Sequence, residues 1–321
     1  MQGMAGKNIM KVMLLGAAGF IGTNLAIQLS KNGVDEITVV DRDEAFFETI
    51  RKLNLKNVTL KVSDFDTDTD FDALLDGQEI VYHLVSTTAP TTCNRQIPRE
   101  LEANVVMTSQ MLEACVRCGV KRVIFISSGG TVYGNEGGRP LDEKTPTYPI
   151  SSYGVQKITI EKLLYLYRYM YGLDYRVVRL SNPYGPYQRP DGILGAVSTF
   201  TYKALRDEEI VVYGDGSIIR DFIYIDDAVR GILNIAAGDN RHRTFNLGSG
   251  RGTSIRQLID TIQDVLKKEL RVVYREGRKV DVAMNCLDIS RYEGAYGKLN
   301  PIDLHEGVSR TAEFMREQLN I

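Results

Sequence analysis

The chain has 321 residues, of which 43% are hydrophobic, 39 are basic and 41 are acidic. The hydrophobic content and only nine prolines exclude a disordered chain, and the length predicts two lobes or one large α/β unit. A formal net charge of −2 leaves no basic excess to hold a phosphate backbone, so we expect no nucleic-acid partner. Because no run of about 18 apolar residues occurs, we also expect no membrane span.

The four cysteines are too few and too scattered for a disulfide scaffold, which indicates a reducing, cytoplasmic location. Cys115 and Cys118 form a CxxC pair at the end of a helical pattern, where packing explains them better than redox chemistry. With only three histidines to add, no cluster has the spacing of a structural zinc site, and we expect no metal.

The first 180 residues alternate short β-rich apolar runs with helical patterns, which is typical of a parallel sheet covered by helices on both faces. This order predicts an α/β fold with a doubly wound parallel sheet, whose ligands bind at the carboxyl ends of the strands. The expected strands span residues 12–15, 36–40, 58–62, 79–85, 122–126 and 175–180, and the expected helices span 21–31, 44–53, 99–118 and 153–171.

A second, smaller lobe is expected after residue 180. A loop rich in Pro, Gly and Tyr is followed by shorter and less regular elements, among them a strand over 220–225 and an amphipathic helix over 255–268. Residues 1–180 therefore make the large domain and residues 181–321 mainly a mixed α/β lobe. Strands near Ile223 and Phe245 are expected to return to the large sheet, so that the lobes interleave.

Gly16, Gly19 and Gly22 follow the first expected strand and open the first expected helix. This spacing allows a tight turn and a close approach of the backbone to a pyrophosphate, while the helix N-terminus offers free N–H groups. Asp41 ends the second strand, where it can accept hydrogen bonds from both adenosine ribose hydroxyls and repel a 2′-phosphate. The pattern predicts dinucleotide binding and favours NAD over NADP, although the neighbouring Arg42 can receive such a phosphate. A turn needed only for helix–sheet packing is the alternative.

Tyr153 and Lys157 stand four residues apart at the start of a helix, where positions i and i+4 share one face. An unperturbed tyrosine ionises near pH 10, so a tyrosine base needs help at neutral pH, and a nearby ammonium favours the phenolate. The pair follows a strand that ends in Ser127 and Ser128, which favours a catalytic pair over a solvated helix face.

These motifs belong to a longer set that appears in order along nearly the whole chain. The set resembles the extended short-chain dehydrogenase/reductase family, in its NAD-dependent nucleotide-sugar epimerase and dehydratase branch. The resemblance implies a Rossmann domain that holds NAD, a smaller lobe that holds a nucleotide sugar, and a homodimer formed through helices 99–118 and 153–171. The residues that carry it are the glycine motif, Asp41, Asp64-Phe65, Asn104-Val105, residues 127–134, Tyr153, Lys157 and residues 179–185.

The resemblance also implies roles for individual residues. Tyr153 is the expected base, and Lys157 is expected to bind the nicotinamide ribose and to lower the pKa of the tyrosine. A guanidinium suits a diphosphate, because its fork pairs with two oxygens. The expected cofactor-binding residues are Gly16, Gly19, Phe20, Ile21, Gly22, Asp41, Arg42, Asp64, Phe65, Leu84, Val85, Ser86, Asn104, Ser127, Tyr153, Lys157 and Pro183. The expected substrate-binding residues are Ser128, Asn182, Arg189, Arg220, Arg278, Asp281 and Asn285.

Residues 129–131 help to separate the reactions of the family. The 4,6-dehydratases have Thr-Asp-Glu there and the uronate decarboxylases have a glutamate at the position of Thr131, whereas this chain has Gly129-Gly130-Thr131. Without these carboxylates we expect 4-epimerisation of a UDP-hexose through a transient 4-keto intermediate. The alternatives are a nucleotide-sugar reductase or synthase, a UDP-glucuronate 4-epimerase and, more remotely, a non-catalytic NAD-binding regulatory protein.

Two departures from the family pattern concern the sugar. Simple 4-epimerases commonly carry Ser or Thr at the position of Gly129, so a hydroxyl for the sugar 4-oxygen must come from elsewhere; Ser128 is our hypothesis and Thr131 the alternative. Four residues after Asp281, hexose-only epimerases tend to have a bulky tyrosine. The smaller Asn285 favours UDP-N-acetylglucosamine or UDP-glucose over UDP-glucuronate.

Overall fold

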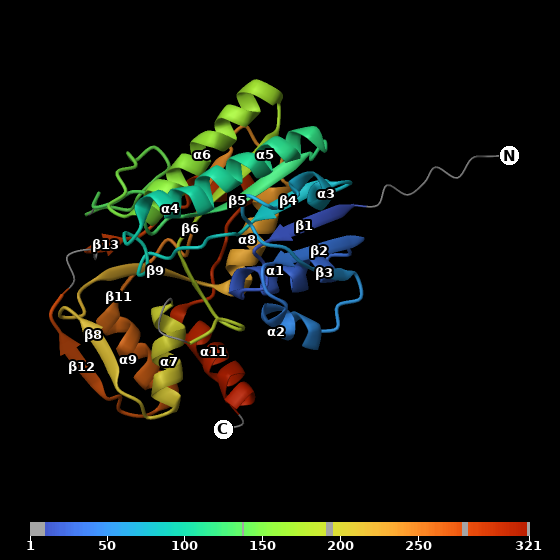
Figure 1. Cartoon of the computed structure of the whole chain (residues 1–321). Coiled ribbons are helices and arrows are strands. Elements are labelled where there is room, and N and C mark those ends of the chain that lie inside the picture. Colours follow the sequence, from blue (N-terminus) through green and yellow to red (C-terminus); the bar gives the residue numbers. More distant parts are fainter. Residues whose placement is uncertain (1–9, 137, 191–194, 278–281, 320–321) are drawn as a thin grey trace.

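Seven parallel strands form the central sheet of the protein (Figure 1). The computed structural model describes residues 10–136, 138–190, 195–277 and 282–319. The strand order is β10-β6-β5-β4-β1-β2-β3, so the chain starts inside the sheet and winds outward in both directions. The strands are β1 Lys11–Leu15, β2 Glu36–Asp41, β3 Val58–Val62, β4 Ile80–His83, β5 Arg122–Ser128, β6 Asp174–Leu180 and β10 Thr244–Leu247.

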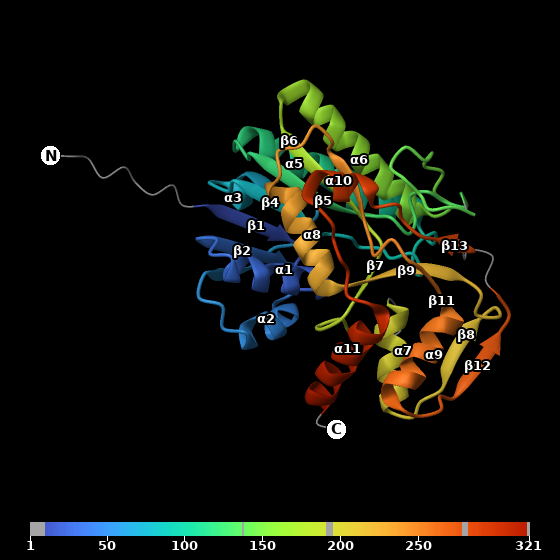
Figure 2. The ribbon, with the colours of Figure 1, turned by 180° about the vertical axis from the view of Figure 1, so that it is seen from behind.

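Helices cover both faces of this sheet, and the view from behind shows α1 and α8 side by side on one of them (Figure 2). That face carries α1 Phe20–Lys31, the 3₁₀ helix η1 Glu44–Phe47, α2 Glu48–Lys52 and α8 Ile225–Ala237. The other face carries α3 Phe71–Leu75, α4 Ile97–Leu101, the π-helical turn η2 Glu102–Val106, α5 Met107–Arg117 and α6 Ser152–Tyr171.

Alternate strand residues pack into two separate cores. In β1, Val12 and Leu14 pack on the side of α1, whereas Met13 and Leu15 pack on the side of α5. Such strands are apolar on both faces because helices cover both. Polar side chains such as Asp41 and Ser128 therefore come at the carboxyl ends of the strands, where the site forms.

The second half of the chain builds a smaller lobe beside the carboxyl edge of the sheet (Figures 1 and 2). In it, β9 pairs with β7, β11 and β13, and β8 pairs with β12, while α7, α9 and α11 contact one another. A short helix, α10 Ser290–Tyr296, packs on β10 of the large sheet. The lobe consists of β7 Asn182–Tyr184, α7 Ala196–Leu205, β8 Ile210–Tyr213, β9 Ile219–Tyr224, β11 Gly252–Ser254, α9 Ile255–Leu266, β12 Val272–Arg275, β13 Met284–Asn285 and α11 Leu304–Leu319.

The predicted fold class is confirmed, and each predicted strand of the large sheet is present. Phe245 lies in β10 at the edge of that sheet, but the prediction for Ile223 was wrong, because β9 pairs in the smaller lobe, with Ile223 opposite Pro183. An apolar run indicates a buried strand without indicating its neighbour. The predicted helix over 99–118 is interrupted by the π-helical turn. Among the described residues, none of the helices combines the length and apolar character that a membrane span requires.

Candidate active site

Two adjoining cavities lie at the carboxyl edge of the large sheet. The larger, about 900 Å³, extends from the ends of β5 and β6 into the second lobe, and the smaller, about 630 Å³, lies over the ends of β1 to β3. They meet at side chains that line both: Phe20, Leu84, Ser86, Thr87 and Gln188. A ligand can therefore extend from one cavity into the other.

The glycine turn, residues 16–22, forms one wall of the smaller cavity. Gly16 has a φ of +70°, and a Cβ there would lie 2.8 Å from the backbone of Val85, so both its conformation and its surroundings require glycine. Gly19 faces open space, with no heavy atom within 4 Å of a Cβ built on it. Gly19 also precedes α1 without any side-chain hydrogen bond that caps the helix. The first N–H groups of α1 are thus available to an anion, as a pyrophosphate requires.

Asp41 lies at the end of β2 and lines the smaller cavity next to the glycine turn. Its carboxylate accepts hydrogen bonds from the backbone N–H groups of Ala18, at 3.0 Å, and Arg42, at 2.9 Å. These contacts fix the carboxylate beside the glycine turn, where it can also accept from ribose hydroxyls. Of the other predicted cofactor residues, Arg42, Asp64, Phe65 and Val85 line this cavity too.

Asn104 braces the loop between the cavities from behind. Its side chain accepts from the N–H of Thr87 at 2.9 Å and donates to the hydroxyl of Thr87 at 2.8 Å. It also donates to the carbonyl of Glu100 at 2.9 Å. Asn104 lies in the π-helical turn, a distortion that often occurs at functional sites. Asn104 therefore contacts the site through Thr87, a loop residue that lines both cavities.

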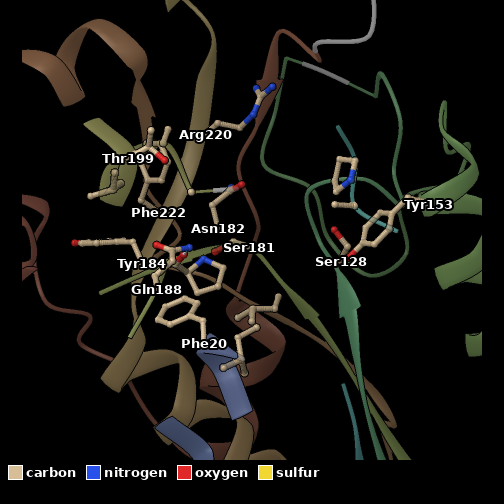
Figure 3. A pocket seen from close by; sticks show the side chains of 18 of the residues that line it. Phe20, Ser128, Tyr153, Ser181, Asn182, Tyr184, Gln188, Thr199, Arg220 and Phe222 are labelled. Atoms are coloured by element: carbon tan, nitrogen blue, oxygen red, sulfur yellow. Dashed lines mark hydrogen bonds between the residues drawn. The ribbon is translucent and has the colours of Figure 1, made fainter. Parts of the chain in front are cut away.

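Tyr153 lies in the first turn of α6, whose N-terminus is capped by the Ser151 hydroxyl, which accepts from the N–H of Gly154 at 3.2 Å. Figure 3 shows the Ser128 hydroxyl beside the phenol of Tyr153. Burial raises the pKa of Tyr153 to about 12, while its hydrogen bond with Ser128 acts in the opposite direction. In this environment the phenol holds its proton at neutral pH.

Lys157 lies one helical turn further along α6 and is 5% exposed. Its ammonium donates to the carbonyl of Ile126 at 3.0 Å and lies 4.8 Å and 5.5 Å from the ring centroids of Phe125 and Tyr153. Burial lowers the pKa of Lys157 to about 8, and Glu161 partly opposes this shift. The expected lowering of the tyrosine pKa is absent from this structure, because burial outweighs the other influences on Tyr153.

Two predicted substrate residues lie on the second-lobe side of the larger cavity. The amide of Asn182 donates to the carbonyl of Asp221 at 2.9 Å, and the guanidinium of Arg220 donates to the carbonyls of Ile219 and Val282 at 2.9 Å and 2.6 Å. Figure 3 shows both on the wall opposite Tyr153. Phe20, Ile21, Ser127, Ser128 and Pro183 also line this cavity. Arg278 and Asp281 fall outside the described residues.

Three other predicted residues lie away from the larger cavity. The Thr131 hydroxyl is buried without a hydrogen-bond partner and does not line the cavity. Asn285 is buried and donates to the carbonyl of Gly129 at 2.9 Å, so it does not face a sugar. Arg189 lines the smaller cavity, with its guanidinium 5.5 Å from the ring centroid of Phe46. The positions of these three side chains depend on packing between distant segments, which the spacing of residues in the sequence does not indicate.

Gln188 and Lys203 are among the polar residues that line the larger cavity and that sequence reasoning missed. Gln188 lies between the two cavities and donates to the carbonyl of Pro183 at 3.2 Å. Lys203 comes from α7, a helix that was not predicted. The sequence does contain a signal for both residues: Gln188 lies in the loop rich in Pro, Gly and Tyr, and Lys203 lies in the helical pattern that follows it.

A glycine turn before an uncapped helix, an acidic residue at the end of β2 and a Tyr–Lys pair beside β5 define a Rossmann-type enzyme that works with a dinucleotide. The family model described as "NAD dependent epimerase/dehydratase family" matches residues 12–248, and the chain belongs to this family. Its cofactor is NAD, and the fit of the smaller cavity to a pyrophosphate and a ribose agrees with that.

Three solved structures show the same fold. UDP-glucose 4-epimerase from Thermotoga maritima, with UDP-glucose, is 33% identical with a TM-score of 0.89, covering 97% of this chain and 100% of that one. UDP-glucuronic acid 4-epimerase from Bacillus cereus, with UDP-glucuronic acid and NAD, is 27% identical with a TM-score of 0.88, covering 96% and 100%. UDP-N-acetylglucosamine 4-epimerase from Methanobrevibacter ruminantium, with UDP-N-acetylmuramic acid, is 28% identical with a TM-score of 0.88, covering 96% and 99%.

Substitutions at two glycines of the turn distinguish a role in folding from a role in cofactor binding. A methyl group at Gly22 would overlap the carbonyl oxygen of Ala17, so we expect Gly22→Ala to lower the melting temperature. A methyl group at Gly19 meets nothing in the protein but stands where a pyrophosphate approaches, so we expect Gly19→Ala to keep the melting temperature and to weaken NAD binding at least tenfold. Thermal denaturation and calorimetric titration with NAD measure the two effects. A Gly19→Ala protein that binds NAD normally would contradict this placement of the pyrophosphate.

Replacement of Lys157 tests the cost of its buried charge. The folded state lowers the pKa of Lys157 from 10.5 to about 8, so the unfolded chain binds more protons between these values and stability rises with pH across that window. We expect Lys157→Met to abolish activity yet to raise the free energy of unfolding at pH 7 by about 1–3 kcal/mol. Urea denaturation at pH 7 and pH 10 measures this, and the gain should shrink at pH 10. A destabilised variant at pH 7 would show that the contacts of the ammonium outweigh its desolvation.

Proposed function

We propose that the protein catalyses the NAD-dependent 4-epimerisation of a UDP-hexose, of the UDP-glucose or UDP-N-acetylglucosamine type. The observation that carries this proposal is the charge of the larger cavity. The described residues that line it include Lys157, Lys203 and Arg220 but no aspartate or glutamate. Cations suit a diphosphate, and the absence of a carboxylate from this lining leaves no second acid or base of the kind that dehydration requires.

Tyr153 is the proposed base, and Ser128 is proposed to hold the sugar 4-oxygen. Both line the larger cavity beside the region that it shares with the smaller one, so a sugar carbon placed there also faces the cofactor. The chemistry that bound NAD would supply there is acceptance of a hydride from that carbon and its return to the opposite face of the sugar. Tyr153 takes the sugar 4-hydroxyl proton as the phenolate and holds it in the interval. The Lys157 ammonium, 5.5 Å from the ring centroid of Tyr153, favours the phenolate against the burial that raises the pKa of Tyr153.

Gly130 lies between two residues that we propose contact the sugar. A Cβ at this position would lie 3.8 Å from the Ser128 hydroxyl and 3.9 Å from the amide oxygen of Asn182. Glycine thus leaves room between two proposed sugar contacts, which supports a sugar that must turn over between two hydride transfers. Asn285 does not support the N-acetyl preference, because its side chain faces Gly129.

We propose that the active form is a homodimer in the cytoplasm. Large apolar side chains on α6 are exposed, with Tyr165 at 62% and Tyr169 at 78%, together with Leu166 and Met170. A patch of this kind on one helix typically marks a protein–protein interface. Within each subunit, residues 1–180 with β10 would hold NAD and most of residues 181–321 the nucleotide sugar.

The proposed reaction can be tested without added cofactor. The purified protein is incubated separately with UDP-glucose, UDP-N-acetylglucosamine and UDP-glucuronate, and the anomeric region is followed by proton NMR. We expect the 4-epimer in the UDP-glucose or UDP-N-acetylglucosamine tube, with no net formation of NADH. No new signal in any tube after NAD is supplied would contradict epimerisation of these three sugars, and stoichiometric oxidation or reduction of the cofactor would indicate a reductase or synthase.

The source of the hydroxyl is tested by a matched pair of substitutions. Ser128 lines the cavity beside Tyr153, whereas Thr131 does not line it. We expect Ser128→Ala to lower kcat by about 10²–10³-fold with little change in KM, because the lost hydrogen bond acts on the reacting oxygen. Thr131→Val should retain kcat within about threefold. Full activity in Ser128→Ala with loss in Thr131→Val would assign the hydroxyl to Thr131.

A further inference from the structure

One face of α6 contacts β5 through three side chains spaced four residues apart, namely Tyr153, Lys157 and Glu161. Tyr153 bonds to Ser128, and Lys157 donates to the carbonyl of Ile126. Glu161 accepts from the Ser127 hydroxyl at 2.6 Å. The helix that carries the proposed base is thus attached to the end of β5 at three successive residues.

Glu161 is also half of a buried ion pair. Arg179 on β6 donates to both carboxylate oxygens of Glu161, at 2.7 Å from Nη2 and 3.1 Å from Nε, and the side chains are 8% and 6% exposed. The same guanidinium donates to the hydroxyl of Tyr133 at 3.0 Å, which donates to the amide oxygen of Asn246 at 2.6 Å. The contacts of Glu161 therefore reach from α6 across β5 and β6 to β10. Neither charged residue lines a cavity, so neither contacts the substrate directly.

Glu161 is also the anion that acts on Lys157. The ionisable groups linked to this ammonium are Tyr153 and Glu161 on α6 and His83 on β4, and Arg179 on β6 lies beyond Glu161 as its ion-pair partner. His83 is neutral at physiological pH, since burial and the charge of Lys157 lower its pKa to about 3. Tyr153 keeps its proton, and Arg179 is cationic. Glu161 alone in this group carries a negative charge, and it favours the protonated form of Lys157.

We propose that Glu161 is a positioning residue for the reaction: held by Arg179, it sets the depth of α6 on β5 and keeps Lys157 charged beneath Tyr153. This inference rests on the proposed catalytic role of the Tyr153–Lys157 pair. In this proposal the protonation of Lys157 depends on the Glu161–Arg179 ion pair. A purely structural ion pair would not affect the protonation of a neighbouring lysine.

The test is Glu161→Gln, which keeps the shape and an acceptor for Ser127 but removes the charge. Protein labelled with ¹³C at the lysine ε-carbon is titrated by NMR, and the Lys157 signal is assigned by its loss in Lys157→Met. We expect Lys157 in Glu161→Gln to titrate about one pH unit lower than in the native protein. The reason is that the substitution removes the anion that favours the protonated form of Lys157, while the burial that lowers its pKa remains. This measurement needs no substrate, so it remains informative if the proposed epimerisation fails.

A second readout connects the charge to turnover. The alkaline limb of kcat against pH should move to lower pH in Glu161→Gln, with kcat within about threefold of native at pH 6.5 and about tenfold lower at pH 8.5. KM for the nucleotide sugar should not change. A uniform loss at all pH values, together with an unshifted Lys157 titration, would overturn the proposal and leave Glu161 a structural residue.

Glu143→Gln is the matched control. Glu143 is another buried carboxylate paired with an arginine, since Arg291 lies 3.2 Å away, and it accepts from the N–H of Asn246 at 2.8 Å. It belongs to the same polar network but is absent from the influences on Lys157. We expect it to lower stability as Glu161→Gln does while leaving the Lys157 titration unchanged. A shift of equal size in the control would show that network disruption, not the charge of Glu161, moves the lysine.

Discussion

The burial of a lysine ammonium at the end of β5 is the constraint on which the rest of the site depends. Removal of such a charge from water costs several kcal/mol, so it persists only where the surroundings offset much of that cost. Here the Ile126 carbonyl accepts its hydrogen bond, and the faces of Phe125 and Tyr153 lie close to it. These contacts require α6 to pack closely against the strand ends. Gly154 meets that requirement, because a Cβ there would lie 2.8 Å from the carbonyl of Thr131.

A second buried charge ties the smaller lobe to this arrangement. The carboxylate of Asp221 on β9 accepts from the N–H and hydroxyl of Ser249, both at 2.7 Å, and from the N–H groups of Gly250 and Leu287, both at 3.2 Å. Burial raises the pKa of Asp221, and these donors act against that rise. Because the amide of Asn182 donates a hydrogen bond to the backbone carbonyl of Asp221, the second-lobe side of the larger cavity is positioned by contacts to the chain that follows β10. The second-lobe wall of the larger cavity is therefore tied by hydrogen bonds to the segment that follows β10.

The sequence was informative where local rules apply. Short β-rich apolar runs located the strands of the large sheet, and the glycine spacing and the Tyr153–Lys157 interval located the turn of the cofactor cavity and the polar pair beside β5. The sequence did not indicate the contacts between segments that lie far apart in the chain. The pairing of Ile223 with β7 rather than with the large sheet, and the positions of Arg189 and Asn285, depend on chain segments 40 or more residues apart. The raised pKa of Tyr153 is also a product of packing, since spacing alone indicated a lowering by Lys157.

A contact between distant segments explains why residue 129 is a glycine, at a position where simple 4-epimerases commonly carry Ser or Thr. A Cβ at Gly129 would lie 2.5 Å from a methyl carbon of Leu287 and 3.1 Å from the carbonyl oxygen of Arg179. Leu287 is buried and held through its N–H by Asp221, and Asn285 binds the carbonyl of Gly129 from the same segment. A serine or threonine at residue 129 therefore has no space unless this segment moves. The neighbouring hydroxyl of Ser128 lines the cavity beside Tyr153, and it is the hydroxyl that we propose for the sugar.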